Sequence, residues 1–194
     1  MSYKLKIGFF ALFFAINLYS KSYVLENQNQ ILDKTADFIE TLSNEVYKKT
    51  GVDLYIVALE SLEGMNLQER EWFYQKNLNN PYVILFFAKK EKKIDIITTY
   101  ETQTMFDKKE VYWDYIVPLI PNSDKELTQQ NVSAFLLNGF MDIADRIAQF
   151  HKVELEHSFS TTNKGIEVTT KMILYLMLFV LLVLFAFVCL RRSK

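Results

Sequence analysis

The sequence is poor in the residues that mark several large protein classes. Its 194 residues include one cysteine, Cys189, so no disulfide can form within the chain. Only five glycines occur, and none forms the glycine-rich loop that cradles phosphates in nucleotide-binding proteins. Zinc-protease and serine-hydrolase motifs are absent as well. The sequence therefore disfavours nucleotide-dependent enzymes and the common hydrolases.

The charge is nearly balanced overall but is unevenly distributed. All 23 acidic residues and fifteen of the 22 basic ones lie between Glu26 and Glu167, which gives this stretch a net charge of −8. The other seven basic residues lie toward the two ends of the chain. An acidic body argues against a nucleic-acid partner, because the phosphate backbone requires clustered Lys and Arg.

The N-terminus predicts a secretory signal. Two lysines precede an uncharged run over residues 7–19, which is 13 residues long, whereas a membrane-spanning helix needs about 20. Small residues, Ser20 and Ser22, follow at the positions that a signal peptidase reads. We predict a signal peptide over residues 1–22 that is cleaved before Tyr23. Cleavage after Ser20 and an uncleaved anchor are the alternatives.

The C-terminus predicts a membrane anchor. Residues 172–190 form an apolar run of 19 residues without charge, Pro or Gly, which is long enough for a single transmembrane helix. The basic tail 191–194 then lies in the cytoplasm, because positive charge collects on the inner side of a membrane. Residues 158–171 form a polar juxtamembrane tether. We predict a single-pass protein of the inner (plasma) membrane, with an exported domain over residues 23–157 in the periplasm or outside the cell.

Hydrophobic periodicity predicts an α/β fold in the exported domain. Apolar spacings of three and four favour long helices, and runs that are apolar at every position favour strands buried on both faces. Gly51 ends the first helix, and Asn66 and Thr128 are candidate caps of later ones. The pattern predicts a three-layer α/β/α domain with a small mixed β-sheet flanked by helices, plus one C-terminal transmembrane helix. The predicted elements are helices over 29–49, 67–79 and 128–150, a shorter helix before Pro121, and strands over 52–59, 82–88 and 94–99.

Acidic residues offer the candidate site that we keep, in preference to His151, Glu154 and His157, which lie at the entry to the tether. The acidic residues gather in and after the third predicted strand, and calcium requires six to eight oxygen ligands. We keep four of them as candidate metal ligands, with a solvated acidic face as the alternative; no catalytic or cofactor-binding residue is predicted. The candidates are Asp95, Glu101, Asp107 and Asp114.

Three short pieces of the sequence resemble the TPM-domain family. They are Thr50-Gly51-Val52-Asp53 after the first helix, Ser61-Leu62-Glu63-Gly64 after the first strand, and Asn79-Asn80 ahead of the second strand, whose partner begins at Lys92-Lys93-Ile94. The resemblance covers about residues 27–150. The family usually has glycine where this chain has Pro81, and a glycine-containing loop where this chain has Tyr100-Glu101-Thr102.

The resemblance implies a function as well as a fold. The family groups thylakoid-lumen photosystem II repair proteins, an auxiliary subunit of nicotinic receptors and many bacterial exported proteins. Together with the predicted membrane tether, the resemblance favours a noncatalytic domain that binds a membrane protein or complex and supports its assembly, repair or stability. The alternative is a calcium-dependent hydrolase that resembles an acid phosphatase, since some members bind calcium or have weak phosphatase activity. The predicted contact with the lipid bilayer is through residues 172–190, and the oligomeric state is left open.

Overall fold

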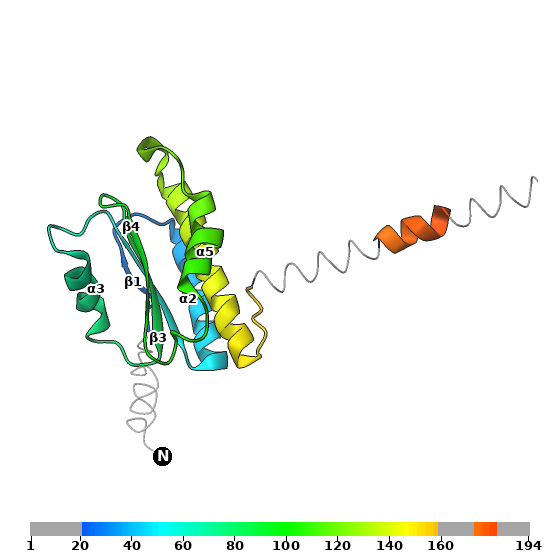
Figure 1. Cartoon of the computed structure of the whole chain (residues 1–194), viewed down its shortest axis with the longest axis horizontal. Coiled ribbons are helices and arrows are strands. Elements are labelled where there is room, and N and C mark those ends of the chain that lie inside the picture. Colours follow the sequence, from blue (N-terminus) through cyan, green and yellow to red (C-terminus); the bar gives the residue numbers. More distant parts are fainter. Residues whose placement is uncertain (1–20, 159–172, 182–194) are drawn as a thin grey trace, which may run out of the picture.

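The computed structural model describes residues 21–158 and 173–181, and its body is built on one mixed sheet (Figure 1). The four strands are β1 (Val24–Asn27), β2 (Asp53–Leu59), β3 (Tyr82–Ala88) and β4 (Lys93–Thr98), in that spatial order. The first three are parallel, and β4 is antiparallel to β3. This confirms the predicted mixed sheet and adds β1, a strand that the sequence pattern did not predict.

Helices cover both faces of the sheet, as predicted. α2 (Asp33–Thr50) and α5 (Gln129–His151) lie on one face, and α3 (Leu67–Gln75) lies on the other (Figure 1). All seven residues of β2 and all seven of β3 are buried, because both strands are apolar on both faces and lie between helices. The three-layer α/β/α arrangement therefore follows directly from the two apolar runs.

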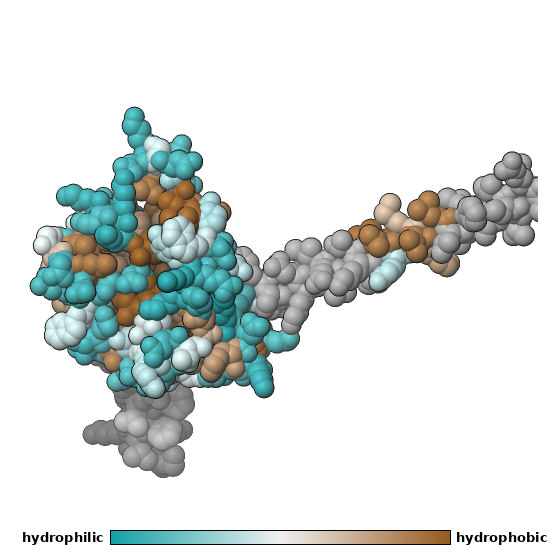
Figure 2. Space-filling model, viewed as in Figure 1, coloured by the Kyte–Doolittle hydropathy of each residue, from teal (hydrophilic) through white to brown (hydrophobic). Residues whose placement is uncertain are grey.

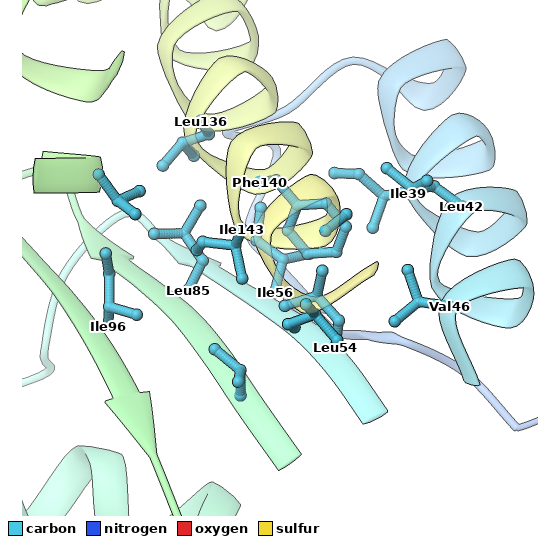
Figure 3. Packing of buried hydrophobic residues seen from close by; sticks show 14 of the residues in the cluster. Ile39, Leu42, Val46, Leu54, Ile56, Leu85, Ile96, Leu136, Phe140 and Ile143 are labelled. Carbon is cyan, nitrogen blue, oxygen red and sulfur yellow. The ribbon is translucent and has the colours of Figure 1, made fainter. Parts of the chain in front are cut away.

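The larger of two apolar cores lies between the sheet and the pair α2 and α5. Ile39 and Leu42 of α2 meet Ile56 of β2 and Phe140 of α5, and all four are fully buried (Figure 3). The smaller core lies under α3. Burial of a side chain of this size stabilises the fold by about 1.5–3 kcal/mol, so the two cores hold the layers together.

The predicted helix caps are confirmed. The Gly51 N–H donates to the Tyr47 carbonyl at 2.8 Å in the left-handed conformation (φ 76°), which glycine adopts without strain. Asn66 forms a capping box with Glu69. The Thr128 side chain accepts the Asn131 N–H. The prediction that the second helix reaches residue 79 is wrong. α3 ends at Gln75, because the asparagines that follow, Asn77, Asn79 and Asn80, favour turns over helix interiors.

The segment after β4 forms short helical turns against α5. It comprises α4 (Lys108–Glu110), the π-helical η1 (Val111–Ile116) and the 3₁₀ turn η2 (Val117–Leu119). η1 packs closely on α5 because Gly139 has no side chain. A Cβ atom there would lie 2.4 Å from Ile116 Cγ1, so glycine is required for this contact.

Most of the predicted signal, tether and anchor lies outside the described residues. Of residues 1–22, only Lys21 and Ser22 are described, and the Lys21 Nζ lies 2.5 Å from the Asp53 Oδ2. Of residues 158–171, Ser158 alone is described, and the tail 191–194 is not. Within the predicted span 172–190, residues 173–181 are helical. Neither described range contains a helix with the length and apolar character needed to cross a membrane.

Candidate functional site

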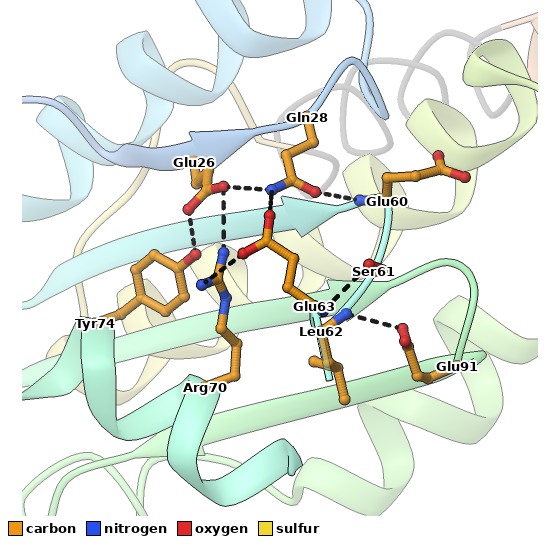
Figure 4. A network of polar contacts seen from close by, with 9 residues as sticks. All are labelled: Glu26, Gln28, Glu60, Ser61, Leu62, Glu63, Arg70, Tyr74 and Glu91. Carbon is orange, nitrogen blue, oxygen red and sulfur yellow. Dashed lines mark hydrogen bonds and ion pairs between the residues drawn. The ribbon is translucent and has the colours of Figure 1, made fainter. Parts of the chain in front are cut away.

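A cluster of polar side chains lies at the carboxyl ends of β1 and β2 (Figure 4). Gln28 joins the two strands: its Nε2 donates to Glu26 Oε1 at 2.7 Å, and its Oε1 accepts the Glu60 N–H at 2.8 Å. We call this group the carboxyl-edge cluster, which is completed by Glu63 and by Arg70 of α3. In open α/β sheets, ligands bind beyond the carboxyl ends of the parallel strands, so this is the first place to look for a site.

Arg70 lies at the centre of the carboxyl-edge cluster and offsets part of its negative charge. Its guanidinium lies 3.5 Å from Glu26 Oε1 and 3.4 Å from Glu63 Oε2, and the residue is only 7% exposed. Tyr74, one turn further along α3, donates its hydroxyl to Glu26. Burial, followed by this hydrogen bond, raises the pKa of Tyr74, so the hydroxyl stays protonated and remains a donor. The positive charge at the centre of the cluster is therefore the guanidinium of Arg70.

The sequence-predicted acidic residues fall in different places. Asp95 lies on β4 opposite Phe86, on the sheet face that α3 covers, where it meets Glu71 of α3. Glu71 is 8% exposed, and its pKa is raised to about 7 by burial and by the neighbouring Asp95, while Lys108 opposes the shift. Near neutral pH this pair therefore holds a proton that two isolated carboxyl groups would have lost.

The other three predicted residues are exposed. Glu101 follows the far end of β4, and hydrogen bonds from its own backbone and from the Thr99 side chain lower its pKa. Asp107 caps α4 by accepting the Lys109 N–H at 2.8 Å. Asp114 lies on η1 with its side chain toward solvent. Each of the three therefore has a local role or faces solvent.

The donor set does not fit calcium. Within residues 21–158 and 173–181, no three or more His, Cys, Asp or Glu residues form a group that could hold a metal ion. Calcium requires six to eight oxygen ligands around one point, and the carboxyl-edge cluster already encloses the guanidinium of Arg70. The described residues thus offer no observation that favours the calcium-dependent hydrolase.

A groove lies along β4, which is an edge strand of the sheet. Two adjoining cavities of about 240 Å³ each share Ile94 and Tyr112 as lining residues. β4 forms the floor of the first cavity, and α4 and η1 form its wall; Trp113 at the rim is 61% exposed. We call the two cavities the β4 groove. In the space-filling view, hydrophobic residues gather in a strip between the side of α3 and the side of α5 (Figure 2).

The β4 groove is richer in positive than in negative charge. Four lysines and two aspartates line the two cavities. Lys92 is paired with Asp124 at 2.7 Å, whereas Lys108 and Lys109 form no ion pair with any residue of the described ranges. A basic, partly aromatic hollow on an otherwise acidic domain is an arrangement that can bind an acidic ligand.

Comparison with known proteins identifies the family. Residues 24–118 match the family model of the TPM domain. Residues 24–118 are therefore a TPM domain, as the three sequence pieces implied.

Two solved structures are similar to part of this chain. One is the N-terminal domain of the cg2496 protein from Corynebacterium glutamicum, with 14% identity, a TM-score of 0.46, and coverage of 66% of this chain and 81% of that one. The other is the BA42 protein from the psychrophilic bacterium Bizionia argentinensis, with 14% identity, a TM-score of 0.46, and coverage of 69% and 95%. No curated protein matches the chain.

The sequence analysis did not identify Arg70 and Tyr74, or Glu71, as candidate site residues. Arg70 and Tyr74 are four residues apart, a spacing that places them on the same side of a helix, and this signal could have been used. Glu71 could not have been found in this way. Its meeting with Asp95 depends on the antiparallel return of β4 beside β3, which brings the two carboxylates together from distant positions in the chain.

Proposed function

We propose that the chain is a membrane-anchored periplasmic protein whose TPM domain binds a membrane protein or complex and supports its assembly, repair or stability without catalysis. Family membership establishes the domain, and the apolar run 172–190 supports the anchor.

The β4 groove is the observation that supports a binding role most strongly. Edge strands of monomeric proteins are normally short, charged or covered, because their free backbone groups invite other strands to pair. Here the edge opens into two cavities with an exposed tryptophan, Trp113, at the rim. Tyrosine and tryptophan are enriched where proteins bind one another, so the groove has the composition of a recognition surface.

The proposed anchor explains how weak contacts could suffice. A domain held at the membrane surface meets membrane partners at a raised effective concentration, without any new contact. Such a domain needs no deep catalytic pocket. What it requires is an open face near the membrane.

Crosslinking in intact cells, followed by affinity purification and mass spectrometry, tests the proposal. The full-length chain is compared with an anchorless chain that lacks residues 172–194, and with a chain in which an unrelated transmembrane helix replaces residues 172–190. We expect one membrane complex with the full-length and helix-exchanged chains, and its loss with the anchorless chain. Recovery of the protein alone from all three would contradict the proposal.

A further inference from the structure

The outer edge of β4 presents backbone groups that no strand pairs with. In an antiparallel pair, residues alternate between bonding to the partner strand and facing away from it. The Thr99 N–H donates to the Tyr82 carbonyl, so the alternation turns the backbone groups of Ile94, Ile96 and Thr98 toward the open edge. These three positions are the ones that another strand would use.

One of these backbone N–H groups already has a hydrogen-bond acceptor within the domain, so it is not free to bond to another strand. The Ile96 N–H donates to the Asp95 side chain at 2.7 Å. A charged side chain on an edge strand hinders uncontrolled pairing between copies of a protein. The groups of Ile94 and Thr98 have no such cover within the described part of the chain, so a short segment can still pair there.

Lysines surround this edge. Lys93 begins β4 and is exposed, and Lys108 and Lys109 line the adjacent cavity. None of the three forms an ion pair with another residue of the described ranges, although the domain as a whole is acidic. Tyr112 and Trp113 add apolar surface on the same side. The edge therefore complements a segment that alternates acidic and apolar side chains.

We infer that the β4 groove binds an extended, acidic segment of the partner protein, which adds to the sheet as a fifth strand beside β4. This rests on the proposed function and specifies how the partner is held. Main-chain hydrogen bonds to Ile94 and Thr98 supply affinity. The lysines and the two aromatic side chains, Tyr112 and Trp113, select the sequence. The strand spans about six residues, the length of β4.

Titration of the full-length chain in detergent with labelled peptides tests the inference. The first probe is a peptide of about nine residues that alternates glutamate and valine; the second has lysine in place of glutamate, and the third has proline at its centre. We expect the acidic peptide to bind at least about tenfold more tightly than either of the others. Equal binding of the acidic and basic peptides would overturn the inference.

Variants of the chain test the placement. Lys93→Glu with Lys109→Glu should weaken binding of the acidic peptide by about tenfold at low salt, and the difference should shrink in 0.5 M salt. Lys34→Glu, an exposed lysine on α2, is the matched control and should bind as the parent does. Asp95→Ala frees the Ile96 N–H to pair with the peptide, so it should tighten binding. Unchanged binding in both groove variants would place the peptide elsewhere.

Amide hydrogen exchange distinguishes strand addition from a purely charged contact. The bound acidic peptide should slow exchange of the Ile94 and Thr98 amides, and unchanged exchange there would exclude a fifth strand. The two proposals can fail separately. A membrane complex recovered from cells with no peptide binding would refute the groove and leave the proposed function standing. Peptide binding without any membrane complex would refute the proposed function.

Discussion

The pair of carboxylates between α3 and β4 makes the stability of the domain depend on pH in a definite direction. Burial first, and then Asp95, raise the pKa of Glu71 from the ordinary 4.5 to about 7. A group whose pKa is higher in the folded protein binds its proton more tightly there. The free energy of unfolding should therefore fall as the pH rises from about 4.5 through about 7, because the folded protein must then release a proton that it binds well.

Replacing Glu71 by Gln tests this directly. The shift of about 2.5 units corresponds to about 3 kcal/mol, at about 1.4 kcal/mol for each unit. The amide does not titrate, so the variant should lose this part of the pH dependence. The difference in unfolding free energy between variant and parent should thus be about 3 kcal/mol more favourable to the variant at pH 8 than at pH 4.5.

Urea unfolding at the two pH values measures this difference. The variant and the parent are compared at each pH, and the result at pH 4.5 is then subtracted from the result at pH 8. This subtraction removes any effect of the substitution that does not depend on pH. Glu126→Gln, at an exposed position, is the matched control. The unfolding free energy of this variant relative to the parent should be the same at both pH values. If Glu71→Gln behaved like this control, the assignment of a retained proton to the Glu71 and Asp95 pair would be refuted.

Four further changes have definite expected outcomes. Gly139→Ala should lower the free energy of unfolding by about 1–3 kcal/mol, since its Cβ would lie 2.4 Å from Ile116 Cγ1; a stability within 0.5 kcal/mol of the parent would contradict this packing. Asn66→Ala removes the capping box and should cost about 1 kcal/mol in urea unfolding. Glu45→Gln should expose residues 153–158 to protease, because Glu45 accepts bonds from the Glu156 and His157 N–H groups; parent-like cleavage would argue against this role. Addition of millimolar calcium should leave the thermal midpoint unchanged, and a clear rise would reopen the metal site.

The Glu45 contacts also carry a pH dependence of the opposite sign. Burial alone would raise the pKa of Glu45, but hydrogen bonds from Lys49, from the Glu156 backbone and from His157 outweigh it and lower the pKa to about 2. The stability that this carboxylate contributes is present above about pH 4.5 and is lost as the pH falls toward 2. The effects of Glu45 and Glu71 on stability can therefore be distinguished, because they change the free energy of unfolding in different pH ranges.

Local patterns were enough to predict most of the fold. Apart from Asp53 at the start of β2, the runs that became β2 and β3 are apolar on both alternating faces, and this pattern is typical of a strand that lies between two layers of helices. β1 was missed because its four residues, Val-Leu-Glu-Asn, are short and half polar. Its strand conformation comes from pairing with β2 rather than from its own sequence.

The candidate site was harder to predict, because nearness in sequence was taken for nearness in space. Asp95 and Glu101 are six positions apart, but Asp95 lies within the extended strand β4 and Glu101 lies beyond its end. Meanwhile Glu71 and Asp95, from different elements, come into contact. Charge clusters along a chain indicate a site only where a turn or a helix keeps their members together.

Photocrosslinking from the β4 groove in intact cells tests the proposed binding role directly. A photoreactive residue replaces Trp113 at the rim of the groove or, as a control, Phe150 on α5, which is 52% exposed and does not line the groove. We expect position 113 to capture an acidic, extended segment of one membrane protein and position 150 not to capture it. Capture from position 150 alone, or from neither position, would contradict a groove-based binding role for this TPM domain.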